Sequence, residues 1–173
     1  SLKYTGRAAE IGLAEVHQAL CANGLRQKVI LRCSGAHQTG SDVVKSALLG
    51  GDSFEFGTTA LMMLKCVMAK NCNVKCPAGL TTNAEAFDGD PRALAQYLLN
   101  IAHDVREILA RLGLKSLREA RGRCDLLHLL DHPASVGRLD LRAMLTVVTE
   151  VKIEKPIYME RDYAIDDTFL DLL

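Results

Sequence analysis

The sequence predicts an α/β fold built from parallel βα units. Two observations lead to this prediction: short β-rich runs alternate with helical patterns, and a glycine-containing loop directly follows each run. Only two strands are visible, at residues 28–33 and 53–56. Because two parallel strands cannot cover their own faces and edges, we expect them to be the C-terminal portion of a larger βα array, completed by another chain or another segment.

A helix is expected over residues 8–22, before the first βα unit. Apolar residues recur there at helical spacing until the turn signal Asn23-Gly24. Residues 28–33 form a β-rich run without a helical stripe, which predicts a strand. The small and polar residues 34–40 predict the loop that follows it.

A helix completes the first unit, and the second unit follows it. Ser41 and Asp42 are suited to cap a helix that ends before Gly50-Gly51. Residues 53–56 predict the second strand, and Gly57-Thr58-Thr59 open another helix after it.

The clearest element is an amphipathic packing helix over residues 91–112. Its apolar residues mark one face at steps of three and four. Asp90 stands at the N-cap before Pro91, and Gly113 supplies a left-handed stop. The boundaries of this helix are therefore predicted as firmly as its existence.

The pattern weakens beyond residue 113. A short helix is expected at residues 116–120 and another at 139–148. After Pro156 we expect extended packing rather than a regular element.

Composition narrows the classes of function. A hydrophobic fraction of 49% with 24% charged residues is typical of a globular protein. Lys plus Arg and Asp plus Glu both number 21, and aromatic residues make up 5%, so neither charge nor stacking favours nucleic acid. No apolar run has the length of a membrane helix, and no signal peptide is visible. We therefore expect a cytoplasmic protein that binds neither nucleic acid nor membrane.

Three of the six cysteines, Cys66, Cys72 and Cys76, lie within eleven residues, and a proline follows the last. Clustered thiolates favour zinc, copper(I) or iron–sulfur, and a Cys-Pro ending is common beside iron–sulfur clusters. Zinc normally takes four ligands in closely spaced pairs, which this sequence lacks. The pattern therefore favours a three-iron cluster. The other three cysteines stand singly, which is typical of core residues.

Small residues follow both predicted strands, in Ser34-Gly35-Ala36 and Gly57-Thr58-Thr59. Such residues allow backbone N–H groups to approach a phosphate closely. In (β/α)8 barrels the loops after strands seven and eight frequently form the phosphate site. The two loops are thus candidates for a phosphate site, although ordinary βα turns have similar composition.

Five motifs follow one another along residues 2–127. They are the segment from Leu2-Lys3-Tyr4-Thr5-Gly6 to His17-Gln18-Ala19-Leu20, the loop Ser34 to Asp42, Phe56-Gly57-Thr58, Cys66 to Gly79, and Gly122-Arg123-Cys124-Asp125-Leu126-Leu127. In this order they resemble the large subunit of the glutamate synthase family, whose patterns are ELGLAExHQ, DGGxxTGxD, FGFGT, CxMAxxCxxxxCPxG and GRTDLL. The resemblance rests on all five together, since no single motif is specific.

The resemblance implies a glutamate-synthase-type oxidoreductase. Residues 1–122 would be the C-terminal half of an FMN-binding (β/α)8 barrel with a 3Fe-4S cluster beside it. Residues 123–173 would extend from it, packing on the barrel or leading to a following domain. Ammonia and 2-oxoglutarate would form 2-iminoglutarate, which reduced FMN converts to glutamate. Ferredoxin or an NADPH-dependent subunit would donate electrons, and the other barrel half and an amidotransferase part would lie elsewhere.

Motif matching implies three groups of site residues. The residues at the imino-acid site would be Glu10 and Gln38, the flavin phosphate would contact Ser34, Gly35, Ala36, Gly57, Thr58 and Thr59, and the cluster ligands would be Cys66, Cys72 and Cys76. The sequence departs from the family at several of these positions. Ser34 replaces the usual Asp, Gln38 replaces a common Lys, and the last two cluster cysteines are one residue closer together.

These departures leave alternatives open. A lysine is able to pair with a dicarboxylate, whereas Gln38 only hydrogen-bonds, so the substrate is 2-oxoglutarate or a related 2-oxo acid. Cys33 and Cys124 stand where the family has other residues, which keeps a four-iron cluster open. An electron-transfer module and a structural subunit without cofactor are the two other functions considered. The visible spectrum separates them: flavin bands, iron–sulfur absorption alone, or a colourless protein.

Overall fold

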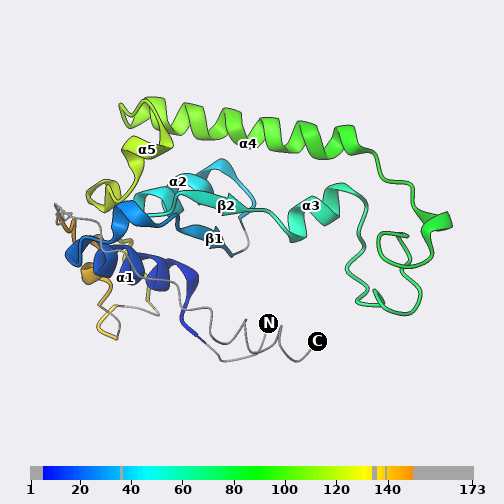
Figure 1. Cartoon of the computed structure of the whole chain (residues 1–173), viewed down its shortest axis with the longest axis horizontal. Helices are drawn as coiled ribbons and strands as arrows, with labels where there is room; N and C mark the ends of the chain where they lie inside the picture. The colour runs from blue at the N-terminus through cyan, green and yellow to red at the C-terminus, as the bar shows by residue number, and fades with distance from the viewer. Residues whose placement is uncertain (1–5, 36, 134–135, 139, 150–173) are drawn as a thin grey trace, which may run out of the picture.

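The computed structural model describes residues 6–35, 37–133, 136–138 and 140–149. It is a mixed α/β structure, mostly helical, with a small two-stranded parallel sheet (Figure 1). Ala36, residues 2–5 of the first motif and the segment after Pro156 lie outside the described residues. The predicted α/β class is confirmed for the described part of the chain.

The two strands are β1 (Arg32–Ser34) and β2 (Ser53–Glu55). They pair in parallel, with Cys33 opposite Phe54 at the centre of the register. Because the strands are parallel, the loops that begin with Gly35 and Gly57 leave the sheet at the same edge. The predicted adjacency of the two loops is therefore built into the sheet.

β1 starts later than the predicted strand at residues 28–33, and this boundary was wrong. Residues Arg26–Lys28 instead form the 3-10 helix η1. The Arg26 guanidinium donates to the carbonyl of Val29 over 2.9 Å, and the carboxylate of Asp52 accepts from the backbone N–H of Leu31 over 2.8 Å. Polar side chains thus take up backbone groups that a longer strand would have paired.

The helices predicted before and after the first strand both form, as α1 (Ala9–Ala22) and α2 (Gly40–Leu48). The N-cap of α2 is Thr39 rather than Ser41 or Asp42. The Thr39 hydroxyl accepts from the backbone N–H of Asp42, and the Asp42 carboxylate accepts from that of Thr39, which completes a capping box. Asp42 therefore caps α2 from inside its first turn.

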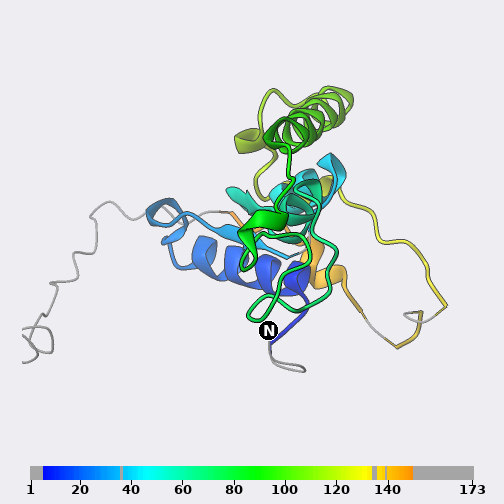
Figure 2. The same ribbon diagram turned by 90° about the vertical axis from the view of Figure 1, so that its right-hand side faces the viewer.

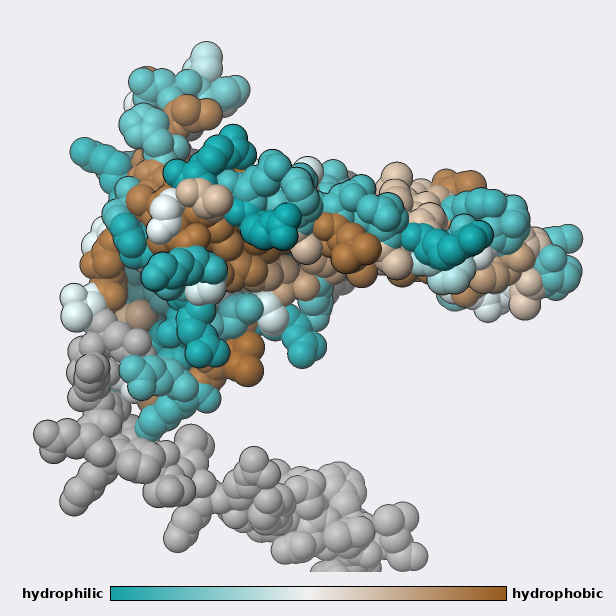
Figure 3. Space-filling model, turned by 90° about the horizontal axis from the view of Figure 1, so that it is seen from above, coloured by the Kyte–Doolittle hydropathy of each residue, from teal (hydrophilic) through white to brown (hydrophobic). Residues whose placement is uncertain are grey.

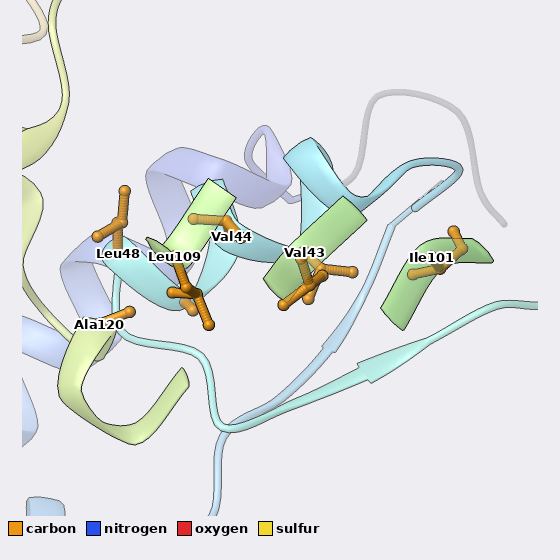
Figure 4. Close-up of a cluster of buried hydrophobic side chains, with 8 residues drawn as sticks. Val43, Val44, Leu48, Ile101, Leu109 and Ala120 are labelled. Carbon is orange, nitrogen blue, oxygen red and sulfur yellow. The ribbon is translucent and has the colours of Figure 1, made fainter. Parts of the chain in front are cut away.

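The long helix α4 (Pro91–Arg111) has the predicted start, with the Asp90 carboxylate accepting from the N–H of Arg92 over 2.9 Å. Its apolar face packs on α2, which also contacts the short α5 (Leu117–Ala120), and the three helices form the main core (Figure 4). The buried members of this core are Val43, Val44, Ala47, Leu48, Ile101, Val105, Leu109 and Ala120. Figures 1 and 2 show α4 on one side of the sheet and α1 on the other.

After β2 the chain leaves the body of the molecule. The helix α3 (Thr58–Met63) leads into an irregular segment with the 3-10 helix η2 (Ala84–Ala86), and the chain then returns along α4 (Figure 1). The three clustered cysteines lie on this projecting segment. It is therefore separated from most of the core.

The segment after α5 contains two 3-10 helices, η3 (Cys124–Leu126) and η4 (Arg142–Leu145). The helix predicted at residues 139–148 is thus wrong within the described part, since only η4 forms there. The carbonyls of Ala143 and Thr146 accept hydrogen bonds from the side-chain amide of Gln18 over 2.9 and 3.1 Å. These contacts attach η4 and the residue after it to α1.

The helices of the described part are not membrane helices. α4 is the longest, with 21 residues, but charged residues cover the side away from its apolar face. No described helix is both long and apolar enough to cross a bilayer.

Candidate functional site

A cavity of about 410 Å³ lies between α1, α2 and the C-terminal end of β1. Glu10 from α1 and Ser34 and Gly35 from the end of β1 all line it. The structure thus brings together three predicted site residues from two separate motifs. Lys45 and His37 also line it, together with other polar residues: Arg32, Asp42 and Ser46.

Glu10 pairs with Lys45 at the wall of this cavity. The Nζ atom of Lys45 is 3.2 Å from Oε1 of Glu10 and 3.8 Å from Oδ1 of Asp42. The pKa of Glu10 is lowered, chiefly by a hydrogen bond from its own backbone N–H and further by Lys45, although desolvation acts in the opposite direction. Glu10 is therefore a carboxylate near neutral pH and is available as a proton acceptor.

Two glycines in the cavity wall have different explanations. A Cβ at Gly35 would lie 3.1 Å from that of Ala9, so the close approach of α1 accounts for this glycine. A Cβ at Gly12 would meet nothing within 4 Å, although glycine inside a helix costs about 0.5–1 kcal/mol relative to alanine. Gly12 therefore keeps open a part of the cavity that no other described residue fills.

The second predicted phosphate loop lies at the same edge of the sheet but outside this cavity's lining. Gly57 has an ordinary φ of −84°, and a Cβ there would meet nothing within 4 Å. The hydroxyl of Thr59 donates to the carbonyl of His37 over 3.4 Å, which links this loop to the one after β1. Thr58 is exposed beside them. Neither backbone conformation nor packing explains the glycine at position 57.

Gln38 does not line the cavity. Its backbone is held from two sides, because the Tyr97 hydroxyl donates to its carbonyl over 2.7 Å and its N–H donates to the Asp42 carboxylate over 3.0 Å. The residue itself is exposed to solvent. The loop backbone is therefore fixed, while the residue that carries the amide is exposed.

His37 is a cavity-lining residue that the sequence did not single out. It is 5% exposed, and its Nε2 lies 2.9 Å from the hydroxyl oxygen of Ser46. The ring packs near those of Phe54 and Phe56. Its Nδ1 is buried and has no hydrogen-bond partner among the described residues. A single histidine in a loop carries no sequence signal that distinguishes such a buried position from an exposed one.

The three clustered cysteines share the projecting segment but differ in exposure. Cys72 is exposed, Cys66 is partly buried and Cys76 is 6% exposed. Within the described residues, no three His, Cys, Asp or Glu side chains come close enough to hold a metal ion together. The donor set itself, three free thiols within eleven residues, has the chemistry that iron–sulfur clusters use.

The pKa of the Cys76 thiol is lowered. Desolvation acts to raise its pKa, but hydrogen bonds from the backbone N–H groups of Leu80, Ala78 and Thr81 outweigh it and lower the pKa to about 7. A substantial fraction of Cys76 is thus thiolate at neutral pH, which is the form that binds metal.

The isolated cysteines behave as predicted for core residues. Cys33 and Cys124 are buried, and desolvation raises the pKa of both thiols. Cys124 packs against Ala14 and Leu49, and this contact attaches the segment after α5 to α1 and α2.

Several motif residues instead maintain the fold around β1. His17 accepts a hydrogen bond from Nε of Arg26 over 3.0 Å. A Cβ at Gly50 would lie 2.2 Å from the His17 ring, and one at Gly122 would lie 2.4 Å from it. The first and last motifs therefore meet at one imidazole, a structural role that the sequence did not reveal.

The family model described as the conserved region in glutamate synthase matches residues 1–115. The chain is 40% identical over 177 aligned residues to the glutamate synthase [NADPH] large chain of Bacillus subtilis, an alignment that covers 97% of this chain. It is 46% identical over 132 residues to the ferredoxin-dependent glutamate synthase of Pyropia yezoensis, which covers 73% of the chain. For ferredoxin-dependent glutamate synthase 1, chloroplastic/mitochondrial, of Arabidopsis thaliana, the identity is 42% over 86% of the chain.

These relatives are much longer proteins. The alignments cover 12% of the Bacillus protein, 9% of the Pyropia protein and 10% of the Arabidopsis protein. The chain thus spans about a tenth of the length of the curated relatives it matches.

Proposed function

Because the chain belongs to the glutamate synthase family, we propose that it forms part of a glutamate-synthase oxidoreductase that reductively aminates 2-oxoglutarate to glutamate. Residues 1–122 would supply the C-terminal half of a (β/α)8 barrel, and residues 123–173 an extension that packs on it. The contact of Cys124 with Ala14 and Leu49 supports such packing.

The observation that carries this proposal is the cavity at the C-terminal end of β1. Active sites of (β/α)8 barrels lie at the C-terminal ends of their strands, where the βα loops meet. Glu10, Ser34 and Gly35 line a cavity at this end, and the Gly57 loop leaves the parallel sheet at the same edge. Both features follow from the two βα units alone.

The surface supports the proposal that further barrel strands complete the structure. β1 and β2 have three residues each, and apolar side chains such as Ile30, 78% exposed, lie on the surface close to them. Figure 3 shows hydrophobic residues exposed among hydrophilic ones, both on the body of the molecule and on the part that projects from it. The remaining strands of a barrel would cover a sheet edge and part of this surface.

The loops after the two strands would hold the FMN phosphate, with Ser34, Gly35, Ala36, Gly57, Thr58 and Thr59 as the contacting residues. The open space at Gly57 fits a phosphate that approaches the backbone closely, because a side chain there would occupy that space. The hydroxyl of Thr58 would add a donor, and that of Thr59 would do so by exchanging its hydrogen bond to the carbonyl of His37 for one to the phosphate. Bound FMN would supply the hydride that reduces 2-iminoglutarate, with electrons delivered through a 3Fe-4S cluster.

Glu10 would act on the nitrogen of the substrate. Its carboxylate is ionised and faces the cavity, so it is able to accept a proton from ammonia as the nitrogen adds to the oxo carbon. Lys45, 3.2 Å away, holds the carboxylate in place. Gln38 would hydrogen-bond the substrate or the flavin edge.

Cys66, Cys72 and Cys76 would hold the cluster through their three sulfur atoms. The low pKa of Cys76, about 7, supports ligation because the thiolate is the form that binds iron. The segment that bears all three cysteines joins α3, directly after the Gly57 loop, to α4. The proposed cluster ligands would therefore follow the proposed flavin loop closely in the sequence.

The partners of the chain follow from the same proposal. They would be 2-oxoglutarate, the remaining barrel half, an amidotransferase part and an electron donor. The names of the relatives include both NADPH and ferredoxin as donors, so both belong to the proposal. A related 2-oxo acid is the second candidate substrate, because the residue at position 38 is an uncharged amide.

The test is the iron content of cysteine variants of the intact protein, purified anaerobically. Cys66→Ser, Cys72→Ser and Cys76→Ser should each lose iron and sulfide and bleach the iron–sulfur absorption. Cys124→Ala, which removes a buried thiol outside the segment, should retain all three signals. Unchanged iron in all three serine variants would refute the cluster, and absence of flavin bands in the native protein would refute the FMN site.

A further inference from the structure

Three consecutive side chains bind the backbone of two of the clustered cysteines. The Thr81 hydroxyl donates to the carbonyl of Cys72 over 2.7 Å. The Thr82 hydroxyl donates to the same carbonyl over 3.4 Å and accepts from the N–H of Cys76 over 2.9 Å. Nδ2 of Asn83 donates to the carbonyl of Cys76 over 3.4 Å.

Thr82 is the centre of this arrangement because its hydroxyl serves both cysteines at once. A hydroxyl offers one donor and two acceptor lone pairs, so the contacts to Cys72 and Cys76 are compatible. The single oxygen thus ties one end of the Cys72–Cys76 turn to the other. Valine has the same shape as threonine but lacks this oxygen.

The rest of the segment offers little to fix the two cysteines. Residues 64–83 contain no helix or strand, and most of them are exposed. Lys65, Met68 and Lys70 have positive φ angles between 54° and 68°, which ordinary side chains rarely adopt. The N–H of Gly79 also donates to the carbonyl of Cys76, over 3.2 Å, whereas the threonine hydroxyls are the side chains that bind the carbonyl of Cys72 in the described structure.

We propose that Thr81 and Thr82 are positioning residues for the cluster, which restrict the backbone of Cys72 and Cys76 so that less of the segment has to become ordered when iron brings the three thiolates together. This inference rests on the proposed function. Hydrogen bonds that hold metal ligands in position lower the conformational entropy that the protein loses when the metal binds. Their loss typically lowers metal affinity about 10–100-fold.

The test compares Thr82→Val with Thr82→Ser in the intact protein purified anaerobically. We expect Thr82→Val to lose iron to a chelator about 10-fold faster or more, because it keeps the shape and removes the hydroxyl. Thr82→Ser should release iron at the native rate, since it restores the oxygen. Thr146→Val, an exposed threonine on the far segment, is the matched control and should behave as native.

Two further readouts separate positioning from a general loss of stability. The thermal midpoint of Thr82→Val should stay close to native, while the electron paramagnetic resonance spectrum of its oxidised cluster should change in line shape. Cys72→Ser is included in the same series. If Cys72→Ser loses its iron but Thr82→Val and Thr81→Val/Thr82→Val keep the native release rate and spectrum, the positioning role is refuted alone. If Cys72→Ser retains its iron, the cluster assignment fails and the positioning role with it.

Discussion

Arg26 and Asp52 form the ion pair at the polar centre of the described structure. Nη2 of Arg26 lies 2.5 Å from Oδ2 of Asp52, and the arginine is only 1% exposed. Asp52 also accepts from Nη1 of Arg121 over 3.0 Å, while Arg26 binds the carbonyl of Gly50 over 2.8 Å. The pair thus joins η1, the start of β2 and the turn after α5.

Replacing Asp52 with asparagine should destabilise the fold strongly. The variant leaves the Arg26 guanidinium buried without its carboxylate, and breaking one side of a buried pair costs about 3–5 kcal/mol. Asp125→Asn is the matched control, because its pair with Arg123 is exposed and should contribute little. Urea unfolding of the intact protein measures both, and an equal effect of the two variants would contradict the role of Asp52.

The same carboxylate should make stability depend on acid pH. Burial acts to raise the pKa of Asp52, but hydrogen bonds from the N–H of Leu31 and from Arg26 and Arg121 outweigh it, so the pKa is lowered. A lowered folded pKa stabilises fully above the unfolded value of about 3.9, and this stabilisation disappears as pH falls through the folded pKa. The free energy of unfolding should therefore decrease as the pH is lowered below about 4.

Asp52→Asn tests that origin directly. The asparagine side chain does not titrate, so the variant should show a shallower decline of the free energy of unfolding between about pH 4 and pH 2. Asp140→Asn, which removes an exposed carboxylate whose pKa Arg142 lowers to about 2, provides the comparison on the surface. An unchanged slope in Asp52→Asn would assign the acid sensitivity to other groups.

The sequence predicted those elements that local patterns determine. The order of helices and strands, the parallel pairing and the start of α4 at Pro91 all follow from neighbouring residues. The boundary of β1 depended on Asp52, about twenty positions away, and the segment around η4 is bound by the amide of Gln18, 125 positions from Ala143. Neither contact has a local signal in the sequence.

The candidate site divides in the same way. Ser34 and Gly35 follow the C-terminal end of β1, and Glu10 meets them because it lies in the first turn of α1, which packs against β1. His37 was missed because its burial depends on Ser46 and two phenylalanine rings. Thr82 was missed because threonine is common in loops, and its double contact depends on how the cysteine segment folds back.

Gly57→Val should remove bound flavin while leaving the fold intact. The φ of Gly57 is −84° and a Cβ there would meet nothing, so valine is compatible with the described structure. The added side chain would occupy the space proposed for the phosphate. Flavin absorption per chain should fall steeply, and the thermal midpoint should stay near the native value.

Gly50→Val is the contrasting variant for that experiment. Gly50 has a φ of +114°, and a Cβ there would lie 2.2 Å from the His17 ring, so this variant should lower the thermal midpoint sharply. In Gly50→Val the flavin should be lost because the protein unfolds, whereas in Gly57→Val it should be lost from a folded protein. Native flavin content in Gly57→Val would show that the phosphate binds elsewhere.

Gln38→Lys should raise turnover of 2-oxoglutarate. Tyr97 and Asp42 hold the backbone at this position, so the substitution changes the side chain without displacing the loop. A lysine would add a positive charge able to pair with a carboxylate of the substrate, whereas the amide only hydrogen-bonds. The main effect should be a lower KM for 2-oxoglutarate, with a smaller effect for 2-oxo acids that have a single carboxylate. Gln27→Lys, an equal change of charge on η1, should leave the turnover of 2-oxoglutarate and its KM unchanged. If the two lysine variants behave alike, position 38 does not determine the substrate and the inference from its amide fails.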